Sequence, residues 1–182
     1  RWFDVRIKRK NKRRDYLKLH ILVDVHTGYI LDFVTTRGRA HDSPPGRRML
    51  RRCTSIECFY GDGAYANRPC TQIVHEKGGI SRVALRDDVT AKSKGAPGWR
   101  ATVLAKQEDE EAYKAAYHIR SFVEATFSSI KKRYGRAVSA RKGWNKKRVL
   151  ALKVVAYNIL TMLRWAEADA RKQGLYERVD QQ

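Results

Sequence analysis

The stretch from Tyr117 to Lys131, YHIRSFVEATFSSIK, is the part of the chain that most constrains its fold. It contains no glycine or proline, and its apolar residues recur at intervals of three and four, which predicts an α-helix. Thr126 is expected on the buried side, where its hydroxyl can donate to a carbonyl one turn back. At about 100° per residue, the apolar residues of that side are Ile119, Phe122, Val123, Phe127 and Ile130.

A second stripe on the same helix combines a phenol, two cations and an acid. Tyr117, Arg120, Glu124 and Lys131 are separated by 3, 4 and 7 positions, so they line up within about 60° of one another. An amphipathic helix with a solvated rim explains such a stripe, because charged pairs at i,i+4 are common. The stripe indicates an active site only if further acids lie upstream on strands.

Charge and cysteine content narrow the class of protein. The chain has 39 Lys and Arg against 19 Asp and Glu, a formal net charge of +20, which indicates a polyanionic partner and nucleic acid above all. A membrane is disfavoured as a partner, because the sequence has no signal peptide and no long uncharged apolar run. Cys53, Cys58 and Cys70 lack zinc-site spacing and indicate structural thiols in a reduced, cytoplasmic setting.

Residues 16–36 predict a β-hairpin. The segments 16–25 (YLKLHILVDV) and 29–36 (YILDFVTT) have strand composition, and residues 26–28 (HTG) supply the turn. Asp24 stands near the end of the first strand, where an unpaired charge after an apolar run is costly. Asp also commonly begins turns, so both interpretations stay open. A further strand is expected from Trp2 to Ile7, followed by a basic run at 8–14 (KRKNKRR) that can lie on a phosphate backbone.

A second acid, Asp62, follows the short apolar strand expected at 57–60 (ECFY). Ligands of α/β proteins collect outside the carboxyl ends of strands, and a glycine on either side leaves the carboxylate accessible. A simple Gly-Asp-Gly turn explains the same residues. A helix is expected from Asn67 or Arg68 to about Glu76, and the last strand is expected at 82–85 (RVAL).

The remaining acids have simpler interpretations. Asp42 or Ser43 is expected to cap a helix that ends at about Arg52, with a catalytic role for Asp42 as the second interpretation. His41 is interpreted as a turn residue. Residues 86–112 lose pattern and are interpreted as a loop before an acidic helix start at 108–111. Side chains of this loop that can touch DNA are Lys92, Lys94, Trp99 and Arg100.

The Tyr-Arg-Glu-Lys spacing resembles the Y-R-E-K signature of the DDE insertion-sequence transposases. Asp24 before its hairpin turn, and Asp62 with Tyr65, resemble the two upstream aspartates of that family. The resemblance implies an α/β fold with an RNase H-like mixed sheet flanked by helices. It also implies that Asp24, Asp62 and Glu124 are the catalytic residues and the metal ligands. Three carboxylates in one cleft would repel one another, and Mg²⁺ or Mn²⁺, expected as two ions, would relieve that repulsion.

The same resemblance implies double-stranded DNA as the partner, cleaved at transposon ends and joined to a target, and a homodimer assembled on that DNA. The cytoplasm of a prokaryote, near the nucleoid, is the expected location. Two other functions stay open: an RNase H-like nuclease or domesticated transposase that does not integrate DNA, and a DNA-binding protein without chemistry. Residues expected to bind DNA are Tyr117, Arg120, Lys131, Lys132, Arg133, Arg141 and Lys142.

We expect one catalytic domain over residues 1–182, with its core at about 15–137. A basic connection and a C-terminal helix are expected at about 138–172, the helix beginning near Lys146. Gly135 is expected to end the preceding helix, and Asn158, among apolar neighbours, is interpreted as a buried amide with satisfied hydrogen bonds. An N-terminal DNA-binding module of the parent protein is expected to lie outside this sequence.

Overall fold

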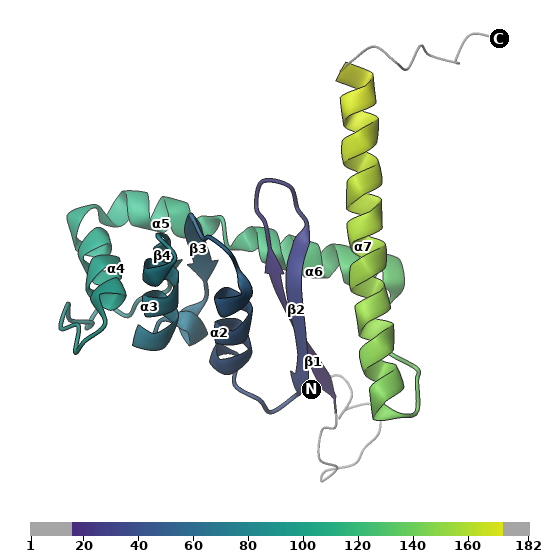
Figure 1. Cartoon of the computed structure of the whole chain (residues 1–182), viewed down its shortest axis with the longest axis horizontal. Helices are drawn as coiled ribbons and strands as arrows, with labels where there is room; N and C mark the ends of the chain where they lie inside the picture. Colours follow the sequence, from purple (N-terminus) through teal and green to yellow (C-terminus); the bar gives the residue numbers. More distant parts are fainter. Residues whose placement is uncertain (1–15, 173–182) are drawn as a thin grey trace.

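The computed structural model describes residues 16–172 of the 182-residue chain, which form a mixed α/β structure (Figure 1). The strand predicted from Trp2 to Ile7 and the basic run at 8–14 lie outside the described residues. The elements are β1 Leu17–Val23, β2 Ile30–Arg37, α2 Ser43–Arg52, β3 Cys58–Gly61, the 3₁₀ turn η1 Gly63–Tyr65, α3 Arg68–Glu76, β4 Ile80–Val83, α4 Pro97–Glu108, α5 Glu110–His118, α6 Ser121–Tyr134 and α7 Gly143–Lys172.

Strands β1 and β2 form the predicted antiparallel hairpin. Leu17 pairs with Arg37 and Ile21 with Phe33, and the register shifts between Leu22 and Val23 just before the turn. The hairpin buries Ile21, Val23 and Ile30 in one cluster with Ile130 of α6 and Val154 of α7. This cluster attaches the last two helices to the hairpin.

Strands β3 and β4 form a parallel pair connected through α3. Parallel strands need such a crossover, and α3 supplies it with Cys70 and Val74 buried against Phe59 and Val83. The Tyr113 hydroxyl of α5 covers the outer edge of β4, since it accepts from the Val83 backbone N–H at 3.0 Å and donates to the Val83 carbonyl at 2.9 Å. The predicted last strand therefore exists, beginning at Ile80 rather than at Arg82.

The described residues do not form the single mixed sheet that the sequence led us to expect. Within residues 16–172 the strands make two separate sheets of two strands each, β1–β2 and β3–β4. The two sheets share a core through Leu22 of β1, which packs against the cluster of Leu50 and Phe59. The α/β class is thus observed, while an RNase H-like sheet remains a prediction.

Residues 86–112 differ most from the expected loop, because they contain helix α4. The helix begins at Pro97, a residue well suited to a first turn, and buries Trp99, Thr102 and Val103. The Trp99 indole donates to the Thr90 carbonyl at 3.0 Å, and the Arg68 guanidinium lies over its ring. Trp99 is therefore a core side chain, and the prediction that it can stack on a base was wrong.

The long helix predicted around 117–131 is two helices joined by a tight turn. Helix α5 ends at His118 and α6 begins at Ser121, while Arg120 keeps helical dihedral angles. The amides of Ile119 and Arg120 bond to carbonyls only three residues back, as in a 3₁₀ turn. Tyr113 attaches α5 to β4, and Ile130 attaches α6 to the hairpin. Helix α5 therefore packs on the β3–β4 sheet and α6 on the β1–β2 sheet.

The predicted apolar side is buried in part, and most deeply in its second half. Thr126 and Ile130 are buried, and the Thr126 hydroxyl donates to the Phe122 carbonyl one turn back, as predicted. Ile119 and Phe122 are instead 40% and 37% exposed. Both stand at or beside the joint between α5 and α6, and the Phe122 ring lies next to Gly28 in the hairpin turn while one edge stays open to solvent.

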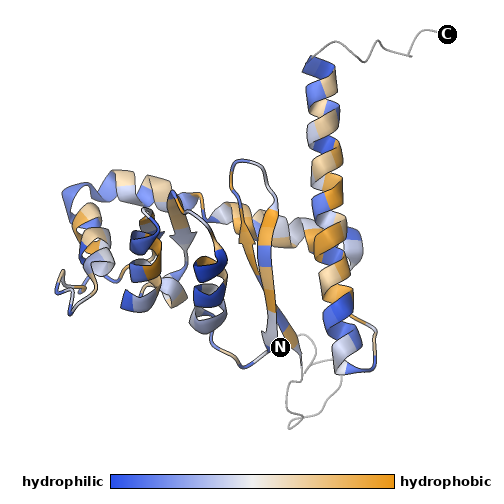
Figure 2. Cartoon of the chain, viewed as in Figure 1, coloured by the Kyte–Doolittle hydropathy of each residue, from blue (hydrophilic) through white to orange (hydrophobic). Residues whose placement is uncertain are grey.

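Helix α7 stands beside the hairpin, and its C-terminal half extends beyond the other described elements (Figure 1). The Asn158 side chain bonds both backbone groups of Ile30, its oxygen accepting at 2.9 Å and its nitrogen donating at 2.9 Å, which confirms the satisfied amide. Orange, apolar residues recur along the whole helix in Figure 2. Contrary to the expectation that the sequence has no long apolar run, α7 could cross a membrane by length and composition, and only 11% of its most apolar 18-residue window is buried; one such helix is weak evidence of a membrane span.

Candidate functional site

Asp62 stands where β3 ends, with its side chain open to solvent. Its backbone is extended, and its Oδ1 accepts from the Ala64 N–H at 3.0 Å, which starts the 3₁₀ turn η1. The second carboxylate oxygen has no hydrogen bond to any described residue. Asp62 therefore serves the turn with one oxygen and leaves the other for a ligand, so its two predicted roles are compatible.

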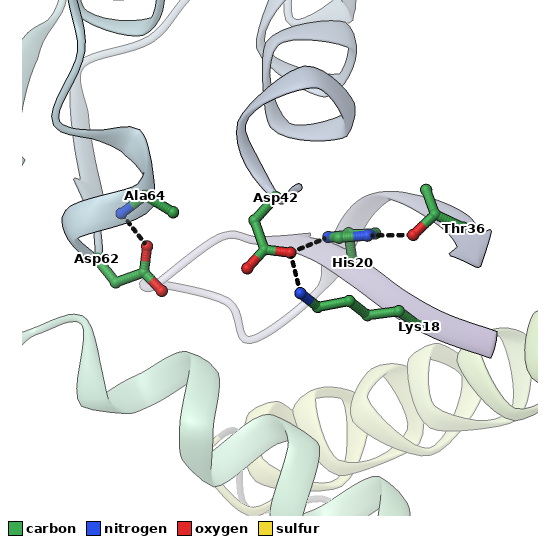
Figure 3. A network of polar contacts seen from close by, with 6 residues as sticks. All are labelled: Lys18, His20, Thr36, Asp42, Asp62 and Ala64. Carbon is green, nitrogen blue, oxygen red and sulfur yellow. Dashed lines mark hydrogen bonds and ion pairs between the residues drawn. The ribbon is translucent and has the colours of Figure 1, made fainter. Parts of the chain in front are cut away.

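Asp42 lies at the start of α2, and its side chain does not act as the predicted cap. It occupies the N-cap position, but its carboxylate makes no capping hydrogen bond. Its Oδ1 instead pairs with the Lys18 ammonium and lies 3.6 Å from His20 Nδ1, both from β1 (Figure 3). The helix start relies on proline in its first turn, so the carboxylate is used for tertiary contacts.

His20 is the buried member of this group. Its Nε2 lies 2.8 Å from the Thr36 hydroxyl on β2, which orients the ring across the hairpin (Figure 3). Burial lowers the pKa of His20, the Asp42 charge opposes this shift, and the Lys18 and Arg48 charges add to it. The imidazole is therefore neutral at pH 7, and Lys18 is the cation that balances Asp42.

Tyr65 connects Asp62 with the Asp42 group. Its ring is largely buried and packs on Gly46 of α2, where any Cβ would collide with the ring. Burial raises the pKa of Tyr65, and the charges of Asp62 and Asp42 raise it further. Both carboxylates thus act on one phenol, which places the end of β3 and the start of α2 in a common polar region (Figure 3).

Asp24 is held within the hairpin turn. The Thr27 hydroxyl donates to its Oδ2 at 2.5 Å, the His26 N–H donates to Oδ1 at 3.2 Å and the Thr27 N–H to Oδ2 at 3.3 Å. The hydrogen bond from the Thr27 hydroxyl is the largest influence and lowers the pKa of Asp24; slight burial opposes this shift, and the His26 and Thr27 amides add to it. This is the geometry of a turn-forming aspartate, the alternative that the sequence left open.

The turn contacts of Asp24 predict an acid-dependent loss of stability. Because its pKa is lower in the folded chain, the stabilisation is complete above about pH 4 and is lost as the pH falls through the folded pKa. Asp24→Asn is expected to cost about 1 kcal/mol at pH 7 and to flatten this acid limb, measured by urea unfolding between pH 3 and 7. Equal losses at pH 3 and pH 7 would contradict the prediction.

Glu124 lies in the first turn of α6 and is well exposed. The Arg120 guanidinium pairs with it at 2.5 Å and also lies 5.1 Å from the centre of the Tyr117 ring. The predicted neighbours of the stripe therefore remain neighbours across the α5–α6 joint. Lys131 is about two turns further on, with its ammonium over the Phe127 ring.

The carboxylates do not form a metal site among the described residues. Within residues 16–172 no group of three or more His, Cys, Asp or Glu side chains could hold a metal ion. Asp24 already uses both oxygens in the turn, and Glu124 is paired with Arg120. Carboxylate oxygens are suitable donors for Mg²⁺ or Mn²⁺, but this arrangement does not hold such an ion.

Comparison with models of known protein families shows which family the chain belongs to. The sequence model described as "Transposase DDE domain" matches residues 2–159. The chain belongs to this family. No curated protein and no solved structure matched the chain.

Exposed cations cluster at the end of α6 and in the connection to α7 of this transposase domain. The last turn of α6 presents exposed Lys131, Lys132 and Arg133, and Gly135, at φ 76°, ends that helix as predicted. Arg141 and Lys142 are exposed in the connection to α7. The residues predicted to bind DNA are thus on the surface, apart from the half-buried Tyr117 and Arg120, and a DNA phosphate can reach the cations.

Sequence reasoning missed Lys18 and His20 of the transposase domain. They stand two positions apart on β1, and side chains at i and i+2 share one face of a strand. That spacing indicated that Lys18 and His20 share a face, but it could not indicate their partner, because Asp42 is about twenty residues further along the chain. The contact could be seen only once the start of α2 had been placed beside β1.

Proposed function

We propose that the chain is the catalytic domain of a transposase that cleaves DNA strands and joins their 3′-hydroxyls to target DNA. The observation that carries this is the position of Asp62, an open carboxylate at the carboxyl end of β3 in a chain of the transposase DDE domain family. Strand cleavage and transfer are phosphoryl transfers, and an acid at this point is suited to that chemistry.

The proposal assigns Asp62 and Glu124 to the reaction and retains Asp24 as the third acid to be tested. Asp42 competes with Asp24, since it acts together with Asp62 on Tyr65. A dependence on Mg²⁺ or Mn²⁺ belongs to the proposal as an expectation from the family. Arg120 and Lys131 would contact the phosphates beside the scissile bond, where charged donors are strongest.

A supercoiled plasmid tests the cleavage step. The 182-residue chain is incubated with the plasmid in Mn²⁺, in Mg²⁺ and in EDTA, and nicking is followed on agarose gels. Joining is tested with a duplex that carries the DNA sequence flanking this reading frame and ends in a free 3′-hydroxyl. Nicking and joining support a transposase, nicking alone supports a nuclease, and DNA binding without either supports a module without chemistry.

DNA binding is expected to depend steeply on salt. Each phosphate neutralised by Lys or Arg releases counterions, so the slope of log K against log salt is about −0.9 per contact. Replacing Lys132 and Arg133 together by Gln is expected to reduce that slope by up to about 2, measured by fluorescence anisotropy of a duplex. The matched control replaces Arg171 and Lys172 by Gln at the far end of α7. Equal slopes for the two double variants would contradict the assignment of the DNA surface.

A further inference from the structure

The β3–β4 sheet has one face that the described chain covers only in part. Its covered face packs on α3, with Phe59 of β3 and Val83 of β4 buried. Side chains alternate across a strand, so Tyr60 and Arg82 lie on the opposite face, where they are direct neighbours and only half-buried. Parallel sheets are normally covered on both faces, so this half-covered face is open to a partner.

The carboxylate of Asp62 belongs to the same half-covered face. Asp62 follows Tyr60 by two residues and its backbone is extended, so both side chains point to the same side of β3. Arg82 is the residue of β4 that pairs with Tyr60. A carboxylate with a free oxygen and a guanidinium therefore share one face near the carboxyl end of the sheet, where ligands of α/β proteins collect.

The Arg82 guanidinium is held in place but has no charged partner. It lies over the Tyr113 ring of α5, 5.1 Å from the ring centre. Its Nη1 is buried without a hydrogen-bond partner, and no ion pair within residues 16–172 includes this guanidinium. A buried donor without an acceptor is costly, so an anionic oxygen supplied from outside the chain would stabilise this arrangement.

A second arginine repeats the arrangement one turn further along α5. Arg120 lies 5.1 Å from the centre of the Tyr117 ring, and Tyr117 follows Tyr113 by four residues on the same side of the helix. Because Arg120 also pairs with Glu124, the two guanidiniums form a row from β4 toward α6, along the path of α5 in Figure 1. The two rings are about 6 Å apart along the helix, and a DNA strand has a phosphate about every 3.4 Å of its axis, so one strand can contact both arginines.

We propose that the half-covered face of the β3–β4 sheet binds the DNA backbone, with the Arg82 guanidinium donating to a phosphate next to the one on which Asp62 acts. The role of Asp62 in this inference rests on the proposed function, whereas the phosphate contact does not. The planar guanidinium matches two oxygens of one phosphate. The residues that the sequence assigned to DNA lie on α5, on α6 and after it, so Arg82 extends the DNA surface to the sheet.

DNA binding without metal tests the phosphate contact. Anisotropy of a fluorescein-labelled duplex is measured in EDTA at several salt concentrations. Arg82→Gln is expected to lower the slope of log K against log salt by about 0.9, which is one phosphate contact and weakens binding roughly eightfold at about 0.1 M salt. Arg82→Lys keeps the charge and is expected to restore the slope. The control Arg68→Gln removes a guanidinium that lies over the Trp99 ring from α3, on the covered side of the sheet, and is expected to match wild type.

Nicking in Mn²⁺ at saturating plasmid tests the position beside Asp62. Arg82→Lys is expected to nick at least about fivefold more slowly than wild type, because an ammonium cannot hold a phosphate through two parallel hydrogen bonds. Wild-type nicking by this variant would overturn the placement beside Asp62.

Three binding results would overturn the phosphate contact: an unchanged slope for Arg82→Gln, an equal fall for Arg68→Gln, or a fall that Arg82→Lys does not restore. The last of these would assign Arg82 to packing on Tyr113 alone. A wild-type chain that never nicks, but whose DNA binding depends on Arg82 as expected, would remove the proposed reaction and support the contact.

Discussion

Asp62→Asn is expected to lower metal-dependent DNA nicking by about 100-fold or more while the chain stays folded and binds DNA. The free oxygen of Asp62 is the part of the side chain that the turn does not use, and the change removes its negative charge. The Asn carbonyl can still accept from the Ala64 N–H, so the free energy of unfolding is expected to change by less than about 0.5 kcal/mol. Nicking rate, thermal unfolding and DNA affinity are measured on the same preparation.

Asp88→Asn is the matched control for Asp62→Asn, because Asp88 is an exposed acid after the other strand of the same sheet. It is expected to leave nicking within about twofold of wild type. Asp24→Asn and Asp42→Asn, measured beside them, decide which acid accompanies Asp62. Full activity of Asp62→Asn would remove this residue from the site and the proposed reaction with it.

Asn158→Ala is expected to destabilise the chain by about 2–3 kcal/mol, which corresponds to a fall in the melting temperature of about 5–10 °C. The change deletes two hydrogen bonds to the backbone of Ile30 and leaves both backbone groups without their partner from α7. Thermal unfolding is compared at one fixed protein concentration, since self-association would make the melting temperature depend on concentration.

Asn145→Ala is the control for Asn158→Ala. Asn145 lies in the first turn of the same helix and makes no side-chain hydrogen bond to any described residue, so a change below about 0.5 kcal/mol is expected. Similar losses for the two variants would mean that α7 is held by its apolar contacts alone. A selective loss for Asn158→Ala would identify the bonds to Ile30 as the attachment of α7 to the hairpin.

The sequence by itself determined the elements whose signals are local. The strands of the hairpin follow from their composition and from the turn residues at 26–28, and α3 follows from Asn67 and Pro69 at its start. The end of α6 follows from Gly135, whose positive φ suits a residue without a Cβ. These features depend on residues within one or two turns of each other, so the pattern contains the information needed to predict them.

Only the tertiary structure decided which faces are covered and which acids have neighbours. Trp99 resembled an exposed loop residue until α4 buried it, and Ile119 resembled a core residue but is 40% exposed at the α5–α6 joint. Asp24 serves its turn, one of the two uses that the sequence left open, and Asp42 pairs with Lys18 instead of capping α2. Each outcome depends on contacts between segments far apart in the chain, and periodicity within one segment cannot specify its partner.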